Sequence, residues 1–162
     1  MPKIYVGTYA KYNAGSLKGQ WLDLEDYNTY DDFMTACREL HADEDDPEIM
    51  FQDFENIPRE FGGECYIKPE FWDYMNCDID DSVKEAYMYL FDEWNEERCN
   101  DTYIGEFDNR TRMAKYLVDE LGMLGEIPES LQYYIDYDAY GLDLELGGDV
   151  GEHNDHYFRT YY

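Results

Sequence analysis

Histidines, cysteines and closely spaced carboxylates are the side chains of this sequence that could perform chemistry. His153 and His156 stand three residues apart beside Asp155, which is a spacing that could hold a metal ion. We interpret both histidines instead as residues of the loop that leads into a final strand, expected from His156 to Tyr162. The third histidine, His41, stands apart from them in the sequence. The histidines therefore give little support to a metal centre.

An acidic run from Asp78 to Asp81 hints at a calcium loop. Such a loop needs a glycine at its sixth position and a glutamate at its twelfth. Here these positions hold Val83 and Tyr89. We therefore predict no calcium site in this run.

Other enzyme signatures are missing from the sequence. It contains no GxSxG, no HExxH and no phosphate-binding glycine loop. With 39 acidic residues, pairs of carboxylates occur at any spacing by chance, so a catalytic dyad cannot be inferred. The cysteines lack a CxxC spacing and favour reduced cytosolic thiols over a disulfide framework or a zinc site. They are Cys37, Cys65, Cys77 and Cys99. The sequence thus predicts no enzyme, no cofactor and no metal.

The charge of the chain is its most unusual property. It has 39 acidic and 12 basic residues and a net charge of −27. The acidic excess occurs in residues 1–62, 63–100 and 101–162 alike. Such self-repulsion destabilises a compact state. A halophile's solubility shell has this composition, and so does a protein that imitates a nucleic acid.

The net charge can be compared with that of duplex DNA, which gives the length of duplex that carries the same number of charges. Duplex DNA carries one charge per ~1.7 Å of axis, so 27 charges at that density cover roughly 46 Å. A compact globule of 162 residues is about 40 Å across. The charge therefore favours an elongated shape.

The composition also limits the compartment and the fold. A hydrophobic content of 44% and an aromatic content of 18% are too high for a disordered acidic tail. No apolar run approaches the ~18 residues of a membrane span, and no signal-peptide pattern begins the chain. We therefore expect a folded cytoplasmic protein without membrane contact. Its 18 tyrosines either cover a small core or contact a partner, and both interpretations are open.

Periodicity and capping residues predict an α+β chain of small domains. An N-terminal α+β domain, 1–62, has strands at 3–10, 19–24 and 48–54 and a helix that Thr29 caps, with Gly62 and Gly63 as a joint. A helical middle domain, 63–100, has a short helix at 69–75 and a longer one. The apolar stripe of that longer helix is Val83, Tyr87, Leu90, Phe91 and Trp94.

A C-terminal α+β domain, 101–162, completes the prediction. It begins with a strand at 103–107, followed by a helix with the stripe Met113, Leu117 and Leu121. Within 119–146 we expect a second helix from Pro128 and then a strand. The buried stripe of that helix would be Leu131, Tyr134, Ile135 and Ala139, and the strand would carry Leu142, Leu144 and Leu146 on one face.

Three blocks of this sequence resemble the ArdA antirestriction family. The first is YVGTY at 5–9, with KYN at 11–13, GS at 15–16 and WLDL at 21–24. The second is ACRELH at 36–41, continuing to DPEIMFQD at 46–53. The third is LGEIPESL at 124–131 with YIDYDAY at 134–140. One position departs from the family pattern, because Leu142 stands where a basic residue is expected.

The resemblance implies an elongated, curved, three-domain protein that dimerises through its C-terminal region. It further implies a mobile-element or phage inhibitor of type I restriction-modification enzymes. Such a protein would occupy the DNA-binding groove of the specificity and modification subunits as a DNA mimic. It would itself bind no nucleic acid.

Two groups of residues are candidates for these contacts. The phosphate-mimicking candidates are Asp119, Glu120, Glu126, Glu129, Asp136, Asp138, Asp143 and Glu145. The candidates for the dimer contact are Tyr103, Ile104 and Phe107. Two other classes of function fit the charge: an acidic chaperone or sequestering factor for another basic DNA-binding protein, and a metal-dependent hydrolase.

Overall fold

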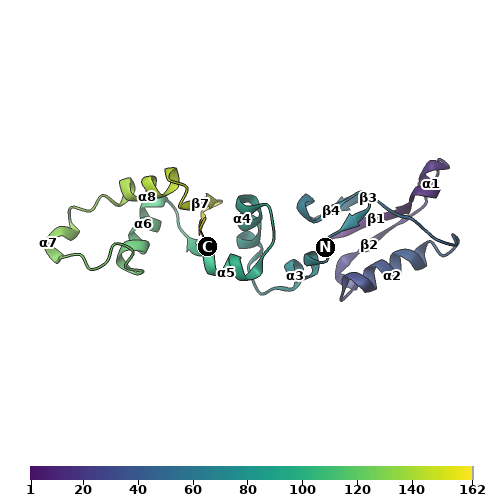
Figure 1. The fold of residues 1–162 in the computed structure, drawn as a ribbon, viewed down its shortest axis with the longest axis horizontal. Coiled ribbons are helices and arrows are strands. Elements are labelled where there is room, and N and C mark those ends of the chain that lie inside the picture. Colours follow the sequence, from purple (N-terminus) through teal and green to yellow (C-terminus); the bar gives the residue numbers. More distant parts are fainter. Residues whose placement is uncertain (162) are drawn as a thin grey trace. The chain divides into compact units, whose positions relative to one another are not determined.

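A computed structural model describes residues 1–161 and divides the chain into two compact units, one of residues 1–77 and one that begins at Asp78 (Figure 1). Both units combine helices with short antiparallel sheets, which confirms the predicted α+β class. The predicted division into three domains stays a prediction. None of the helices within 1–161 has both the length and the apolar character needed to cross a membrane.

The first unit is built on a three-stranded antiparallel sheet in the order β2-β1-β3. Its strands are β1 (Lys3–Thr8), β2 (Gln20–Asp23) and β3 (Ile49–Glu55). Ile4 and Val6 are fully buried on one face, as the alternation of β1 predicts. Helix α2 (Tyr30–Leu40) packs on this face, with the Phe33 ring 5.9 Å from the Phe51 ring.

Capping side chains set the helix boundaries of this unit. The Thr29 hydroxyl accepts a hydrogen bond from the Asp32 N–H at 3.1 Å, which confirms the predicted start of α2. Thr8 caps α1 (Tyr9–Asn13) in the same way. The predicted first strand therefore ends two residues early, at Thr8, and a helical turn follows it over Tyr9–Asn13.

The remaining elements of the first unit are short. They are η1 (Leu24–Asp26), η2 (Arg59–Phe61), β4 (Gly62–Gly63), β5 (Tyr66–Ile67) and α3 (Glu70–Asn76). Gly62 and Gly63, which we interpreted as a joint, pair with β5 inside the unit. Helix α3 confirms the short helix predicted at 69–75.

The second unit contains a sheet in the order β6-β8-β7. Its elements in chain order are α4 (Asp81–Phe91), α5 (Glu96–Thr102), β6 (Tyr103–Glu106), α6 (Arg110–Asp119), α7 (Glu129–Gln132), α8 (Tyr137–Leu146), β7 (Val150–His153) and β8 (His156–Arg159). The α4 stripe packs as predicted, because Val83 and Tyr87 are buried in a core with Phe158. Helix α5 and strand β7 were not predicted.

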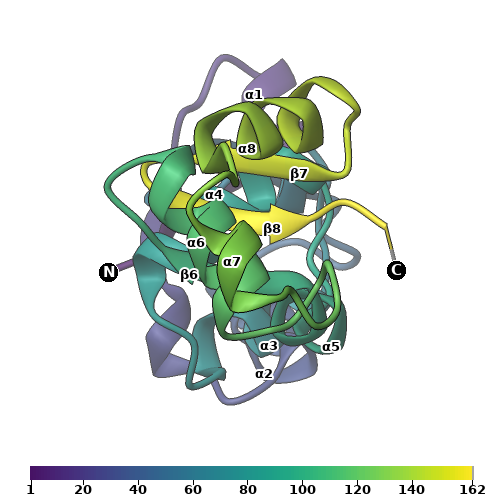
Figure 2. The same cartoon turned by 90° about the vertical axis from the view of Figure 1, so that its left-hand side faces the viewer.

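The predictions for residues 119–146 are partly wrong. Helix α7 ends at Gln132, and Leu131 and Tyr134 are 52% and 83% exposed, so the predicted stripe is not buried. A new helix, α8, begins instead because the Asp136 carboxylate caps the Ala139 N–H at 3.0 Å. Helix α8 replaces the predicted strand over 142–146 and lies beside α6 and β7 (Figure 2).

The helix before this segment also differs at its end. Met113 and Leu117 are buried as predicted, but Leu121 is exposed. Helix α6 ends at Asp119, and Gly122 turns the chain with a φ of +62°, a backbone conformation that glycine adopts at low cost.

Candidate partner-binding surface

Three of the predicted phosphate-mimicking acids lie on the segment between α6 and α8. Glu120, Glu126 and Glu129 are exposed. Among the residues that the structure describes, these carboxylates form no ion pair. Each is therefore free to meet a positive group on a partner.

The other predicted acids have partners within the unit. Arg110 of α6 forms ion pairs with Asp138 at 3.0 Å and Glu145 at 3.3 Å. This arginine lowers the pKa of Asp138, and a hydrogen bond from Thr111 adds to the effect. Asp119 accepts a hydrogen bond from the Tyr137 hydroxyl at 2.9 Å, and Asp136 caps α8. Asp143 is exposed on α8.

Gly141 explains why α8 lies so close to Arg110. A Cβ at this position would stand 3.0 Å from the Arg110 carbonyl oxygen and 3.3 Å from the Ala114 Cβ. The missing side chain lets α8 approach α6 until Asp138 and Glu145 reach the guanidinium. The candidate acids therefore include some that form no ion pair within the described residues and others whose interactions inside the unit stabilise the fold.

The predicted dimer-contact residues lie on β6 and just after it. Strand β6 is an edge strand of its sheet. Ile104 and Phe107 are partly buried against the unit's own core, and the Tyr103 hydroxyl lies 2.9 Å from His156 Nδ1. These side chains thus have internal partners, and the dimer contact stays a prediction.

Apolar side chains are exposed around α7. Tyr133 and Tyr134 are 93% and 83% exposed. Leu121, Met123, Leu124 and Leu131 are also exposed. Large apolar patches on a monomer surface are typical of interaction sites. We call residues 120–135 the α7 segment.

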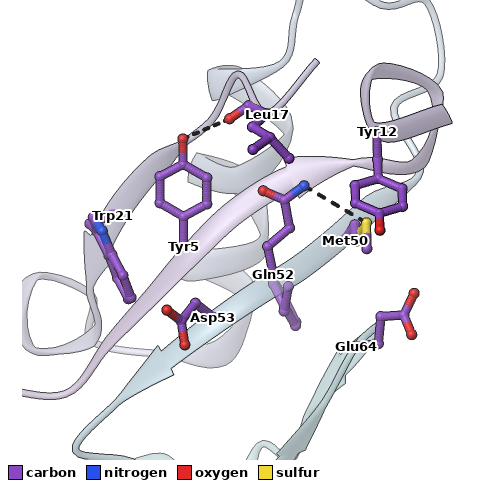
Figure 3. Close-up of a pocket in the computed structure, with 9 residues that line it drawn as sticks. Tyr5, Tyr12, Leu17, Trp21, Met50, Gln52, Asp53 and Glu64 are labelled. Atoms are coloured by element: carbon purple, nitrogen blue, oxygen red, sulfur yellow. Dashed lines mark hydrogen bonds between the residues drawn. The ribbon is translucent and has the colours of Figure 1, made fainter. Parts of the chain in front are cut away.

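The first unit has an aromatic hollow that sequence reasoning did not find (Figure 3). It has a volume of about 730 Å³ and lies on the sheet face opposite α2. Its lining residues are Tyr5, Tyr12, Leu17, Trp21, Met50, Phe51, Gln52, Asp53 and Glu64. They come from β1, α1, β2, β3 and the turn before β5, so no local spacing in the sequence reveals them.

A second cluster in this unit joins Lys11 to the loop after α2. Lys11 Nζ lies 2.8 Å from Asp43, 3.2 Å from Glu44 and 2.8 Å from His41 Nδ1. His41 is buried, and its Nε2 donates to the Val6 carbonyl oxygen at 3.1 Å. Lys11 and Thr8 lower the pKa values of Asp43 and Glu44. The cluster holds an acidic loop on the sheet.

The residues that could have formed a metal centre have other partners. His153 and His156 are cross-strand neighbours on β7 and β8 and not loop residues, because Asn154 and Asp155 form the turn with positive φ. His153 stacks on Tyr89. Residues 1–161 contain no group of three or more histidine, cysteine or acidic side chains placed to hold a metal ion.

The burial of Cys37 argues against a reactive thiol at this position. Cys37 and Cys99 are buried, and none of the four cysteines forms a disulfide within residues 1–161. Burial raises the pKa of the Cys37 thiol to about 12, so it is not a nucleophile near neutral pH.

The fold and these surfaces define an acidic α+β protein with exposed carboxylates and exposed aromatic side chains. The sequence model of the antirestriction protein (ArdA) family matches residues 4–159, which is nearly the whole chain. The chain therefore belongs to the ArdA antirestriction family. A comparison with curated proteins gives no match.

Proposed function

We propose that this protein is an antirestriction protein that acts as a DNA mimic. It occupies the DNA-binding groove of type I restriction-modification enzymes, at their specificity and modification subunits, and so protects incoming mobile-element or phage DNA. It binds by competition and performs no turnover. The observation that carries the proposal is the family match together with the net charge of −27.

The distribution of the carboxylates supports this mechanism. A protein that imitates DNA must present negative charge that is not already neutralised by its own bases. Glu120, Glu126 and Glu129 of the α7 segment meet this condition, and Asp143 on α8 is exposed as well. DNA-binding grooves gain most of their affinity from contacts with phosphates, so these carboxylates stand in for phosphates.

We also propose that the protein acts as a homodimer in the cytoplasm. The exposed leucines and tyrosines of the α7 segment support a second copy as one occupant of this surface, and the open edge of β6 supports the predicted contact at Tyr103, Ile104 and Phe107. A dimer carries about 54 net charges, which at ~1.7 Å each span roughly 90 Å, or about 27 base pairs. That length suits a large DNA-binding groove.

Phage plating tests the proposed function. Unmodified phage is plated on hosts that carry a type I system, with and without this protein, and on a restriction-null host. We expect plating to rise toward the level of the null host. Full restriction by several type I families, with the folded protein present in the cell, would contradict the proposal.

A further inference from the structure

A glycine and a β-bulge shape the aromatic hollow of the first unit. In β1, Gly7 stands on the same face as Tyr5, and the Gln52 amide fills the space that a side chain at this position would take. A Cβ on Gly7 would stand 2.9 Å from Gln52 Cδ. A glycine in a strand often marks such a place of close approach.

The bulge places two polar side chains in the hollow. Tyr5 pairs with Asp53 and Val6 pairs with Phe51, so Gln52 is the extra residue on β3. Adjacent residues of a regular strand point to opposite faces. Because of the bulge, the adjacent residues Gln52 and Asp53 both line the hollow, and the nearly buried Phe51 contributes to its lining as well. Bulges redirect side chains in this way at functional sites.

The walls of the hollow are aromatic and fixed. The Tyr5 and Trp21 rings are 5.5 Å apart at 71°, and the Tyr5 hydroxyl donates to the Leu17 carbonyl oxygen at 2.8 Å. Tyr12 stands on the opposite side of Gln52 (Figure 3). Tyr12 and Trp21 are 50% and 36% exposed. Flat ring faces are thus available to a ligand.

Two carboxylates lie at the hollow. Asp53 and Glu64 are exposed, and within 1–161 neither carboxylate forms an ion pair. Gln52 Nε2 donates toward Met50 Sδ, which turns the amide oxygen toward Tyr5 (Figure 3). Aromatic faces together with carboxylates favour a flat cation, because guanidinium stacks on rings and donates several hydrogen bonds in its plane.

We propose that this hollow binds an arginine side chain of the protein partner. The proposal rests on the proposed function, because a groove that binds DNA presents arginines to its phosphates. The hollow is wide and its rim is exposed, so a side chain delivered by a large partner suits it better than an enclosed small molecule. The arginine would stack on Trp21 and pair with Asp53. This contact should therefore contribute more to binding than the other charge contacts of the protein, and we call it the anchor.

Titration of the full-length protein with blocked arginine (N-acetyl-arginine amide) tests the hollow alone. We expect saturable shifts of the Trp21 indole N–H signal in NMR spectra. Blocked citrulline, which has the same shape without the charge, and blocked lysine should give at most one third of the apparent affinity. Absent shifts, or equal shifts with all three probes, would overturn the proposal.

Binding to a purified type I specificity–modification complex tests the hollow in its proposed role. Asp53→Asn and Trp21→Leu should each weaken binding about tenfold. Asp26→Asn removes the same charge from an exposed position of this unit outside the hollow and should cost less than threefold. Equal losses for Asp53→Asn and Asp26→Asn would overturn the arginine site and leave the proposed DNA mimicry intact.

The two proposals can also fail separately. If the unaltered protein does not bind the complex while blocked arginine does bind the protein, the proposed function fails and the arginine site stands.

Discussion

Two segments of this chain that carry acidic residues are held very differently. The loop at 41–48 of the first unit is fixed by Lys11, which pairs with Asp43 and Glu44, and by the buried His41. The α7 segment has exposed carboxylates without ion pairs among the described residues, next to exposed leucines and tyrosines. The first arrangement uses negative charge to stabilise the fold. The second leaves negative charge for a partner.

The same distinction occurs within the second unit. Arg110 holds Asp138 and Glu145, so these acids stabilise the contact between α6 and α8. Helices α6 and α8 are the two stems of the α7 segment. A chain with a net charge of −27 therefore uses some of its carboxylates to pair with its own bases, and a count of acidic residues overstates the charge that stays unpaired.

The largest effect on binding is expected from the α7 segment. Replacing Glu120, Glu126 and Glu129 together by glutamine should weaken binding to the type I complex by roughly 10- to 100-fold, in additive steps, because each carboxylate replaces one phosphate. The free energy of unfolding should change by less than about 0.5 kcal/mol. Competition binding and urea unfolding measure the two effects. A single substitution that abolished inhibition in a folded protein would contradict distributed charge.

The next effect is on stability. Gly141→Val places a side chain against the Arg110 carbonyl oxygen, which is backbone and cannot give way. We expect α8 to move off α6, with a loss of about 1–3 kcal/mol in the free energy of unfolding. Ala139→Val adds bulk at an exposed position of the same helix and serves as the control. Equal stability of the two variants would show that the contact between α6 and α8 does not need the glycine.

Substitutions of Asp136 distinguish its effect on stability from its effect on binding. Asp136→Ala removes the cap of α8 and should cost about 1 kcal/mol in unfolding free energy. Asp136→Asn keeps a capping oxygen, so its stability should match the unaltered protein while its binding falls slightly. Thermal unfolding and competition binding distinguish the two variants. A lower thermal midpoint for Asp136→Asn than for the unaltered protein would show that the stabilisation comes from the charge and not from the capping oxygen.

The smallest effect depends on pH. Folding lowers the pKa values of Asp43 and Glu44 below 3.8 and 4.5 and raises that of Lys11 above 10.5. The stabilisation by this cluster is therefore complete between about pH 4.5 and 10.5. It is lost as the pH falls through the lowered acid pKa values, and also as it rises through the raised lysine pKa.

Lys11→Met measures this contribution. Its thermal midpoint should lie a few degrees below that of the unaltered protein at pH 7, and the difference should shrink below pH 4. Lys68→Met, on an exposed residue of the same unit, is the control. A difference that stays constant from pH 7 to pH 3 would show that the loop is not held by charge.

Local sequence signals predicted much of the fold. Thr29 marked the start of α2, because a cap depends on residues within one turn. The alternation of Leu142, Leu144 and Leu146 misled, because five residues are too few to distinguish a strand from a helix. The cap at Asp136 and the packing at Gly141 decide in favour of the helix, and the packing involves residues 27 or more positions away.

The candidate sites were predictable only in part. The acids of the α7 segment could be named from the sequence, but their division into free and paired groups depends on Arg110. The aromatic hollow depends on the register of β1, β2 and β3 and on the bulge at Gln52. Only the folded sheet brings Tyr5, Trp21 and Asp53 together.

The most direct measurement is displacement of labelled duplex DNA from a purified type I specificity–modification complex by this protein, followed by fluorescence anisotropy. DNA mimicry predicts complete displacement, no ternary complex, and an apparent affinity that falls steeply as salt rises. A ternary complex of enzyme, DNA and this protein, or inhibition that salt does not weaken, would contradict the account.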